Sequence, residues 1–102
     1  MNLIFDQGVP HLLRRHLVNH VVETSAELGW STLQNGDLLE AAERAGYDAL
    51  VTTDQNLTGR KLAIVVLRST SWPKMQQRLE VICAVIDAVS VGEYVEIELA
   101  AK

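Results

Sequence analysis

With 102 residues, the chain is long enough to bury one hydrophobic core and too short for two domains of ordinary size. Hydrophobic residues make up 48% of the sequence and charged residues 22%, a balance that is typical of globular proteins and excludes a largely disordered chain. The formal net charge of -4 excludes a protein that binds nucleic acid through bulk positive charge, because phosphate contacts need clustered Lys and Arg. We therefore expect a single domain over residues 1–99 and a short C-terminal tail at 100–102.

Neither an oxidising compartment nor a membrane is indicated by the sequence. Cys83 is the single cysteine, so no intramolecular disulfide can form. The start MNLIFDQG lacks the basic segment and the apolar run of a signal peptide, and no apolar stretch reaches the roughly 18 residues that span a bilayer. We expect a cytoplasmic protein that does not associate with a membrane.

Apolar residues follow strand and helix periodicities in turn along the chain. Continuous apolar runs such as LAIVVL are typical of a strand covered on both faces, whereas the alternating EYVEIEL is typical of an edge strand with one wet face. The expected elements are strand 2–5, helix 10–19, strand 20–23, a structured loop over 24–34, helix 37–45, strand 48–53, strand 62–67, helix 71–89 and strand 93–99.

This order of elements predicts an α/β fold with a mainly parallel sheet and helices on both faces. In open sheets of this kind, ligands bind beyond the carboxyl ends of the strands. The connection from Asp54 to Lys61 is short, since a parallel crossover generally needs a dozen or more residues. Either a shortened loop or a segment absent from the sequence would explain it.

Three acidic residues are expected near the carboxyl ends of the strands. Asp6 closes the first apolar run, Asp54 ends ALVTTD, and Asp37 begins the helix of residues 37–45. Two carboxylates about 4 Å apart repel by roughly 4 kcal/mol at an effective dielectric of 20, and a hard divalent cation removes this conflict. Mg²⁺ or Mn²⁺ in such a site activates water for phosphodiester hydrolysis. Taken singly, each acid has another interpretation, as a turn residue or a helix cap.

Several stretches resemble the short PIN-like proteins, relatives of the PIN-domain ribonucleases that include VapC-type toxins. They are FDQGVP, then ELGW and NGDLLEAAERAGYDALVTTDQN, and finally AIVVL, and together they cover nearly the whole chain. The resemblance implies a three-layer α/β sandwich with about five strands, and an acidic cluster that binds Mg²⁺ or Mn²⁺ and cleaves single-stranded RNA. Asp6, Asp37 and Asp54 match the catalytic and metal-binding acids of the family. Glu27 and Asn56 are further candidate ligands, although Asn56 is neutral where many relatives have an acid.

The leading hypothesis is a metal-dependent endoribonuclease whose substrate is RNA. One biological role for such an enzyme is that of the toxin in a toxin–antitoxin pair. Thr53, Arg60 and Lys61 are candidate substrate-binding residues. An alternative is a catalytically inactive PIN-like module that binds an antitoxin-like protein or a second copy of itself. A further alternative is that the acids only cap turns and that the apolar surface of the helix at 71–89 forms a homodimer, through Met75, Leu79 and the segment from Cys83 to Ile86.

Overall fold

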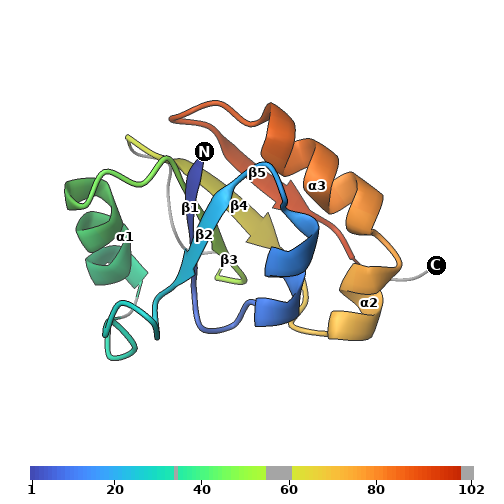
Figure 1. The fold of residues 1–102 in the computed structure, drawn as a ribbon, viewed down its shortest axis with the longest axis horizontal. Coiled ribbons are helices and arrows are strands. Elements are labelled where there is room, and N and C mark those ends of the chain that lie inside the picture. Colours follow the sequence, from blue (N-terminus) through green and yellow to red (C-terminus); the bar gives the residue numbers. More distant parts are fainter. Residues whose placement is uncertain (34, 55–60, 100–102) are drawn as a thin grey trace.

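The computed structural model describes residues 1–33, 35–54 and 61–99, with Asn35 described by its backbone alone. Within these ranges it contains every strand that the sequence predicts (Figure 1). The first strand has the predicted bounds, and the other four are shifted or shortened at their ends by one or two residues. The elements are β1 (Asn2–Phe5), the 3-10 helix η1 (His11–His16), β2 (Val21–Thr24), α1 (Asn35–Arg44), β3 (Ala49–Thr52), β4 (Ala63–Leu67), α2 (Trp72–Gln76), α3 (Leu79–Ala88) and β5 (Tyr94–Ile97).

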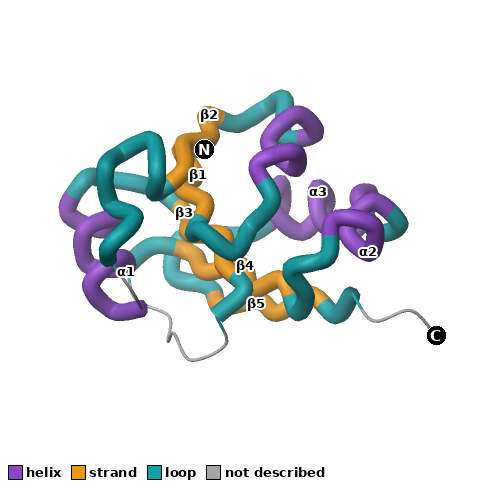
Figure 2. Tube along the Cα trace, turned by 90° about the horizontal axis from the view of Figure 1, so that it is seen from below, coloured by secondary structure: helices purple, strands orange, loops and turns teal. Residues whose placement is uncertain are grey.

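The five strands form one sheet in the order β2-β1-β3-β4-β5, and every neighbouring pair is parallel. The predicted five-stranded parallel sheet is therefore confirmed. Because all strands run in the same direction, their carboxyl ends lie along one edge of the sheet. Figure 2 looks onto this edge from below and shows the loops that follow the strands.

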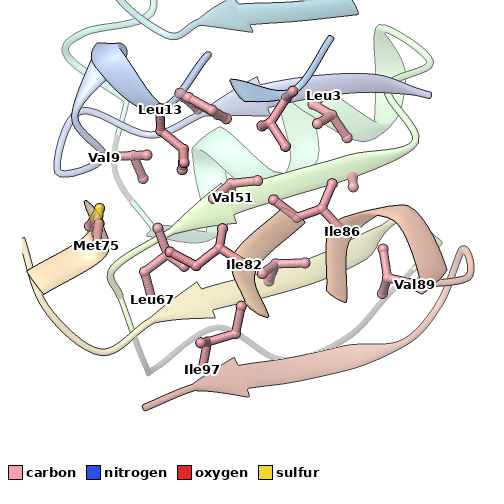
Figure 3. Packing of buried hydrophobic residues seen from close by; sticks show 14 of the residues in the cluster. Leu3, Val9, Leu13, Val51, Leu67, Met75, Ile82, Ile86, Val89 and Ile97 are labelled. Atoms are coloured by element: carbon pink, nitrogen blue, oxygen red, sulfur yellow. The ribbon is translucent and has the colours of Figure 1, made fainter. Parts of the chain in front are cut away.

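The helices cover both faces of the sheet, which makes the fold a three-layer α/β sandwich as expected (Figure 1). Successive residues of a strand point to opposite faces. In β1, Leu3 and Phe5 join the core under η1, α2 and α3, whereas Ile4 joins the core under α1. Figure 3 shows the larger core, in which Leu13 of η1 and Ile82 of α3 lie on the same side of the sheet.

Burial confirms the predicted character of the last two strands. All residues of β4 are buried, because β4 has strand neighbours on both sides and helices on both faces. β5 lies at the edge of the sheet, where Glu96 is exposed and Ile97 is buried. The contrast between LAIVVL and EYVEIEL thus correctly identified a central and an edge strand.

The helix predicted over residues 71–89 was wrong as a single element, because it is divided into α2 and α3. Arg78, with φ -125° and ψ 21°, leaves helical geometry at the junction. Gln77 and Arg78 are both exposed, so reorienting the chain there costs no core burial. No helix within the described ranges is long and apolar enough to cross a membrane.

The helix predicted over residues 10–19 was wrong in type and in length. Leu13 N–H donates to Pro10 O at 3.1 Å and Leu17 N–H donates to Arg14 O at 3.2 Å, which are the i to i+3 bonds of a 3-10 helix. Leu13 and Leu17 are buried all the same. The apolar periodicity that predicted a helix here does not distinguish an α-helix from a 3-10 helix.

The apolar surface that suggested a homodimer is covered by the chain's own sheet. Met75, Ile82 and Ile86 have an exposed fraction of 0%, and Leu79 and Cys83 are partly buried against the same core. Burial raises the pKa of the Cys83 thiol, whose Sγ donates to His16 O at 3.5 Å. Core packing therefore explains this run of apolar residues, while homodimer formation stays a prediction.

The short connection between β3 and β4 is compatible with their parallel pairing. A strand of four residues is roughly 13 Å long, and an extended chain covers about 3.3 Å per residue. Residues 53–62 are thus long enough to return to the start of β4 even without a crossover helix, although 55–60 lie outside the described ranges.

Candidate functional site

Asp6 and Asp54 lie at the carboxyl ends of β1 and β3, which are neighbours in the sheet. Asp6 N–H donates to Val51 O at 2.9 Å, continuing the ladder between the two strands. The hydroxyl of Thr52 donates to Asp6 Oδ2 at 2.8 Å and accepts a hydrogen bond from the Asp54 N–H at 3.0 Å. Thr52 is fully buried, so the link between the two acidic residues is held by the core of the sheet.

The two acids remain partly accessible, in contrast to Thr52. Asp6 Oδ1 accepts a hydrogen bond from the Gln7 N–H at 2.7 Å, so each oxygen of the Asp6 carboxylate has one donor and keeps lone pairs for another ligand. The pKa of the Tyr94 phenol is raised by burial, then by the hydrogen bond to and the charge of Glu96, and also by the charge of Asp54. The charge of Asp54 is thus a minor cause of the raised pKa of Tyr94.

The loop after β1 approaches the end of β3 closely at Gly8. A Cβ atom added to Gly8 would lie 2.4 Å from the Thr53 hydroxyl oxygen, closer than real Cβ atoms come to other atoms. Glycine therefore lets this loop lie against Thr53, beside Asp54. Thr53, predicted as a substrate-binding residue, is partly exposed next to the acids.

Asp37 lies in the first turn of α1 and is exposed, a position in which its charge favours the helix dipole. In residues 1–33, 35–54 and 61–99, no three His, Cys, Asp or Glu side chains lie close enough together to hold a metal ion. The structure therefore links Asp6 with Asp54 but does not assemble the expected cluster of three carboxylates. A role for Asp37 stays a prediction.

The pair of acids nevertheless fits a magnesium or manganese ion in its ligand chemistry. Mg²⁺ commonly binds proteins through one or two carboxylates and keeps several of its waters. Asp6 and Asp54 offer two such carboxylates at an edge that water can reach. Asn56, the further candidate ligand, lies outside the described residues, as does Arg60.

Lys61 lies at the opposite edge of the sheet from the acids. It precedes β4, and its N–H donates to Glu43 Oε2 at 2.9 Å. In a parallel sheet, a residue that precedes a strand is at the amino edge. The structure therefore does not bring Lys61 to Asp6 and Asp54.

Glu27 lies in the turn after β2, where it forms a reciprocal pair of hydrogen bonds with Thr24. Thr24 N–H donates to Glu27 Oε1 at 2.9 Å, and Glu27 N–H donates to the Thr24 hydroxyl at 3.1 Å. Arg14 Nη1 also donates to Glu27 Oε1, at 2.7 Å. The hydrogen bond from Arg14 is the main reason why the pKa of the Glu27 carboxyl lies below its usual range, with the Thr24 N–H second. The Glu27 side chain is thus held by Arg14 and by Thr24, the residue that precedes its turn.

A pocket of about 450 Å³ opens between the loop after β1, η1 and the turn after β2. Its polar lining includes Gln7, His11, Arg14, Ser25 and Glu27. The Ser25 hydroxyl is buried and has no hydrogen-bond partner among the described residues. Gln7 directly follows Asp6, so this pocket lies beside the acid pair.

Sequence reasoning assigned no role in the site to Ser25, and it did not predict the contacts that Thr52 and Arg14 make. The Thr24 to Glu27 spacing is that of a capping box and could have indicated the turn. No local pattern indicates that Arg14 reaches Glu27, because the contact depends on how η1 lies against β2.

Comparison of the chain with protein-family models, with curated protein sequences and with solved structures found no match.

Proposed function

We propose that this protein is a metal-dependent ribonuclease of the PIN-like type. The observation that carries the proposal is the pair of acids at the carboxyl ends of β1 and β3, joined through the buried Thr52 hydroxyl. Ligands of parallel α/β sheets bind at this edge. The resemblance of FDQGVP and TTDQN to PIN-like sequences agrees in position, because these stretches contain Asp6 and Asp54.

In this proposal, Asp6 and Asp54 would hold Mg²⁺ or Mn²⁺. The bound ion would polarise a phosphoryl oxygen and lower the pKa of a water molecule. Thr52 fixes the orientation of the Asp6 carboxylate, and the Gln7 N–H restrains its second oxygen. Thr53, which lies directly before Asp54 and is partly exposed, is available to contact the substrate. The net charge of -4 is compatible with an RNA substrate when a cation screens the site.

The test is cleavage of single-stranded RNA with and without Mg²⁺, by the wild type and by Asp6→Asn and Asp54→Asn. Asn is similar in size, and at position 6 its amide oxygen can accept from the Gln7 N–H while its amide nitrogen donates to the Thr52 hydroxyl, so the fold should persist. We expect cleavage to fall by more than the roughly 10- to 100-fold that losing a hydrogen bond to a metal ligand costs.

Asp48→Asn is a matched control for these variants. Asp48 lies next to the same two strands but at their amino ends, where its Oδ2 accepts a hydrogen bond from the Asn2 N–H at 2.7 Å. We expect this variant to cleave RNA as the wild type does. Cleavage that survives in both Asp6→Asn and Asp54→Asn would contradict the proposal.

The second candidate function is a catalytically inactive PIN-like module that acts by binding an antitoxin-like protein. It is favoured by the finding that no group of three potential metal ligands exists in the described part of the chain. Calorimetric titration with Mn²⁺ distinguishes the two candidates. Binding that Asp6→Asn removes supports the ribonuclease, whereas no binding at millimolar Mn²⁺ supports the inactive module.

A further inference from the structure

The pocket beside the acid pair has the size and accessibility of a small-molecule site. Its volume of about 450 Å³ falls within the range of roughly 300–1,000 Å³ that is usual for such sites. The side chains of Arg14 and Glu27 are 38% and 49% exposed, so a ligand can reach them from solvent. Apolar residues, among them Val9 and Pro10, complete the lining.

The charges in the pocket favour a neutral polar ligand over an anion. Arg14 and Glu27 form an ion pair at 2.7 Å, and their charges largely cancel. A phosphate group would have to approach the Glu27 carboxylate together with the Arg14 guanidinium. A neutral ring that carries both donors and acceptors meets no such repulsion.

Several hydrogen-bonding atoms of the pocket are not used by the described residues. Glu27 Oε1 accepts from both Arg14 and Thr24, whereas Glu27 Oε2 accepts no hydrogen bond within the described ranges. Arg14 uses Nη1 for Glu27 and for Val22 O, which leaves the Nε and Nη2 donors. Ser25 adds its buried hydroxyl, which has no partner in the described ranges. A buried polar group without a partner is costly, so a ligand that bonds to it gains affinity.

We propose that this pocket binds a purine base and prefers guanine. Guanine presents the N1–H and N2–H₂ donors, which match the Glu27 carboxylate, and the O6 and N7 acceptors, which match Arg14. Adenine presents an N1 acceptor, which the carboxylate repels. His11 in the lining provides a ring of the kind on which RNA bases stack. The inference rests on the proposed ribonuclease function, in which this base belongs to the nucleotide next to the one held at Asp6.

The experiment is isothermal titration calorimetry of the full chain with 5′-GMP, 5′-IMP and 5′-AMP, in the presence of EDTA. The three nucleotides share the same phosphate, so their differences report on the base. We expect 5′-GMP to bind most tightly and 5′-AMP to bind roughly tenfold more weakly or worse, with 5′-IMP, which lacks the N2 amino group, in between. Glu27→Gln should weaken 5′-GMP binding and reduce this preference.

Glu40→Gln is the matched control, because Glu40 forms an ion pair of the same length with Arg44 on α1, outside the pocket. It should bind 5′-GMP as the wild type does. In case Glu27→Gln disturbs the turn, the wild type gives a second readout, since 5′-GMP should shift the backbone amide NMR signals of Ser25 and Glu27. Equal affinity for the three nucleotides, or shifts that avoid this turn, would overturn the proposal.

The outcomes for the pocket and for the ribonuclease are separable. A preference for 5′-GMP without metal-dependent RNA cleavage would support the proposed base-binding pocket and contradict the proposed ribonuclease function. Metal-dependent cleavage without any preference for 5′-GMP would support the ribonuclease function and contradict the proposed base-binding pocket.

Discussion

The carboxyl edge of the sheet carries two polar arrangements that are built in different ways. One is centred on Thr52, whose exposed fraction is 0%, and it uses short side chains at the ends of the central strands. The other is the ion pair of Arg14 and Glu27, whose long side chains are 38% and 49% exposed beside the edge strand β2. Short side chains anchored in the core hold a fixed geometry, as a catalytic site requires, whereas long exposed ones can adapt to a ligand.

The Arg14 and Glu27 pair also covers the free edge of β2. Val22 O accepts from Arg14 Nη1 at 3.3 Å, and Thr24 N–H donates to Glu27 Oε1. These backbone groups would otherwise be open to pairing with another strand. The exposed arrangement thus protects a sheet edge, while the buried arrangement links two strand ends.

Among the substitutions that compare the two arrangements, Thr52→Val should have the largest effect on stability and on activity. Valine keeps the shape of threonine but removes the hydroxyl that donates to Asp6 and accepts from Asp54. We expect the free energy of unfolding to fall by about 1–3 kcal/mol. We also expect the proposed metal-dependent cleavage to fall by roughly 10- to 100-fold. Urea unfolding and RNA cleavage measure the two effects.

Thr70→Val is the control for this variant, because Thr70 is exposed. Its unfolding midpoint should match that of the wild type. If Thr52→Val were equally harmless, the Thr52 hydroxyl would not link the two strand ends in solution.

A smaller effect is expected at Gly8, where the loop after β1 lies against Thr53. Gly8→Ala must displace the Thr53 hydroxyl, since the added Cβ would lie 2.4 Å from it. The obstructing atom is the end of a side chain that can rotate, so we expect a loss of about 1 kcal/mol, at the low end for overpacking. Urea unfolding of Gly8→Ala, Thr53→Ala and the double variant forms a double-mutant cycle.

In this cycle, the double variant should lose less stability than the sum of the single variants, because Thr53→Ala removes the obstructing oxygen. Gly36→Ala is the control, since a Cβ there meets nothing within 4 Å and alanine favours the helix α1. Strict additivity at Gly8 and Thr53 would show that the two residues do not touch.

The smallest effect should come from Glu27→Gln, and it should depend on pH. The pKa of Glu27 is lowered in the folded protein from its ordinary value of 4.5, chiefly by the hydrogen bond from Arg14. A lowered folded pKa stabilises the protein above the unfolded value, and this contribution disappears as the pH falls through the folded value. Thermal unfolding at a series of pH values should show the wild type slightly more stable than Glu27→Gln at neutral pH, with the difference lost in acid. If the difference in stability between the wild type and Glu27→Gln stayed constant below pH 4.5, the lowered pKa of Glu27 would not be its cause.

Much of the fold was predictable, because apolar periodicity reports which residues are buried. The continuous run of β4 and the alternating run of β5 gave both the strands and their places in the sheet. The predicted helix over 71–89 was wrong because periodicity does not report a change of direction between two exposed residues, Gln77 and Arg78.

The candidate site was predictable only in part. Asp6 and Asp54 follow apolar strands, and the carboxyl ends of parallel strands necessarily share one edge, so their proximity followed from the order of elements. Asp37 follows no such rule, since its place depends on how α1 packs, and among the residues that the structure describes it belongs to no group of three potential ligands.

The sequence by itself thus determined the layers of the sandwich, the direction of the strands and the edge on which Asp6 and Asp54 lie, because these depend on burial patterns and chain order. Only the tertiary structure decided that Thr52 joins the two acids and that Arg14 reaches Glu27. Each of these contacts joins residues from separate elements, and its geometry depends on strand register or on how one element packs against another. A linear pattern does not contain that information.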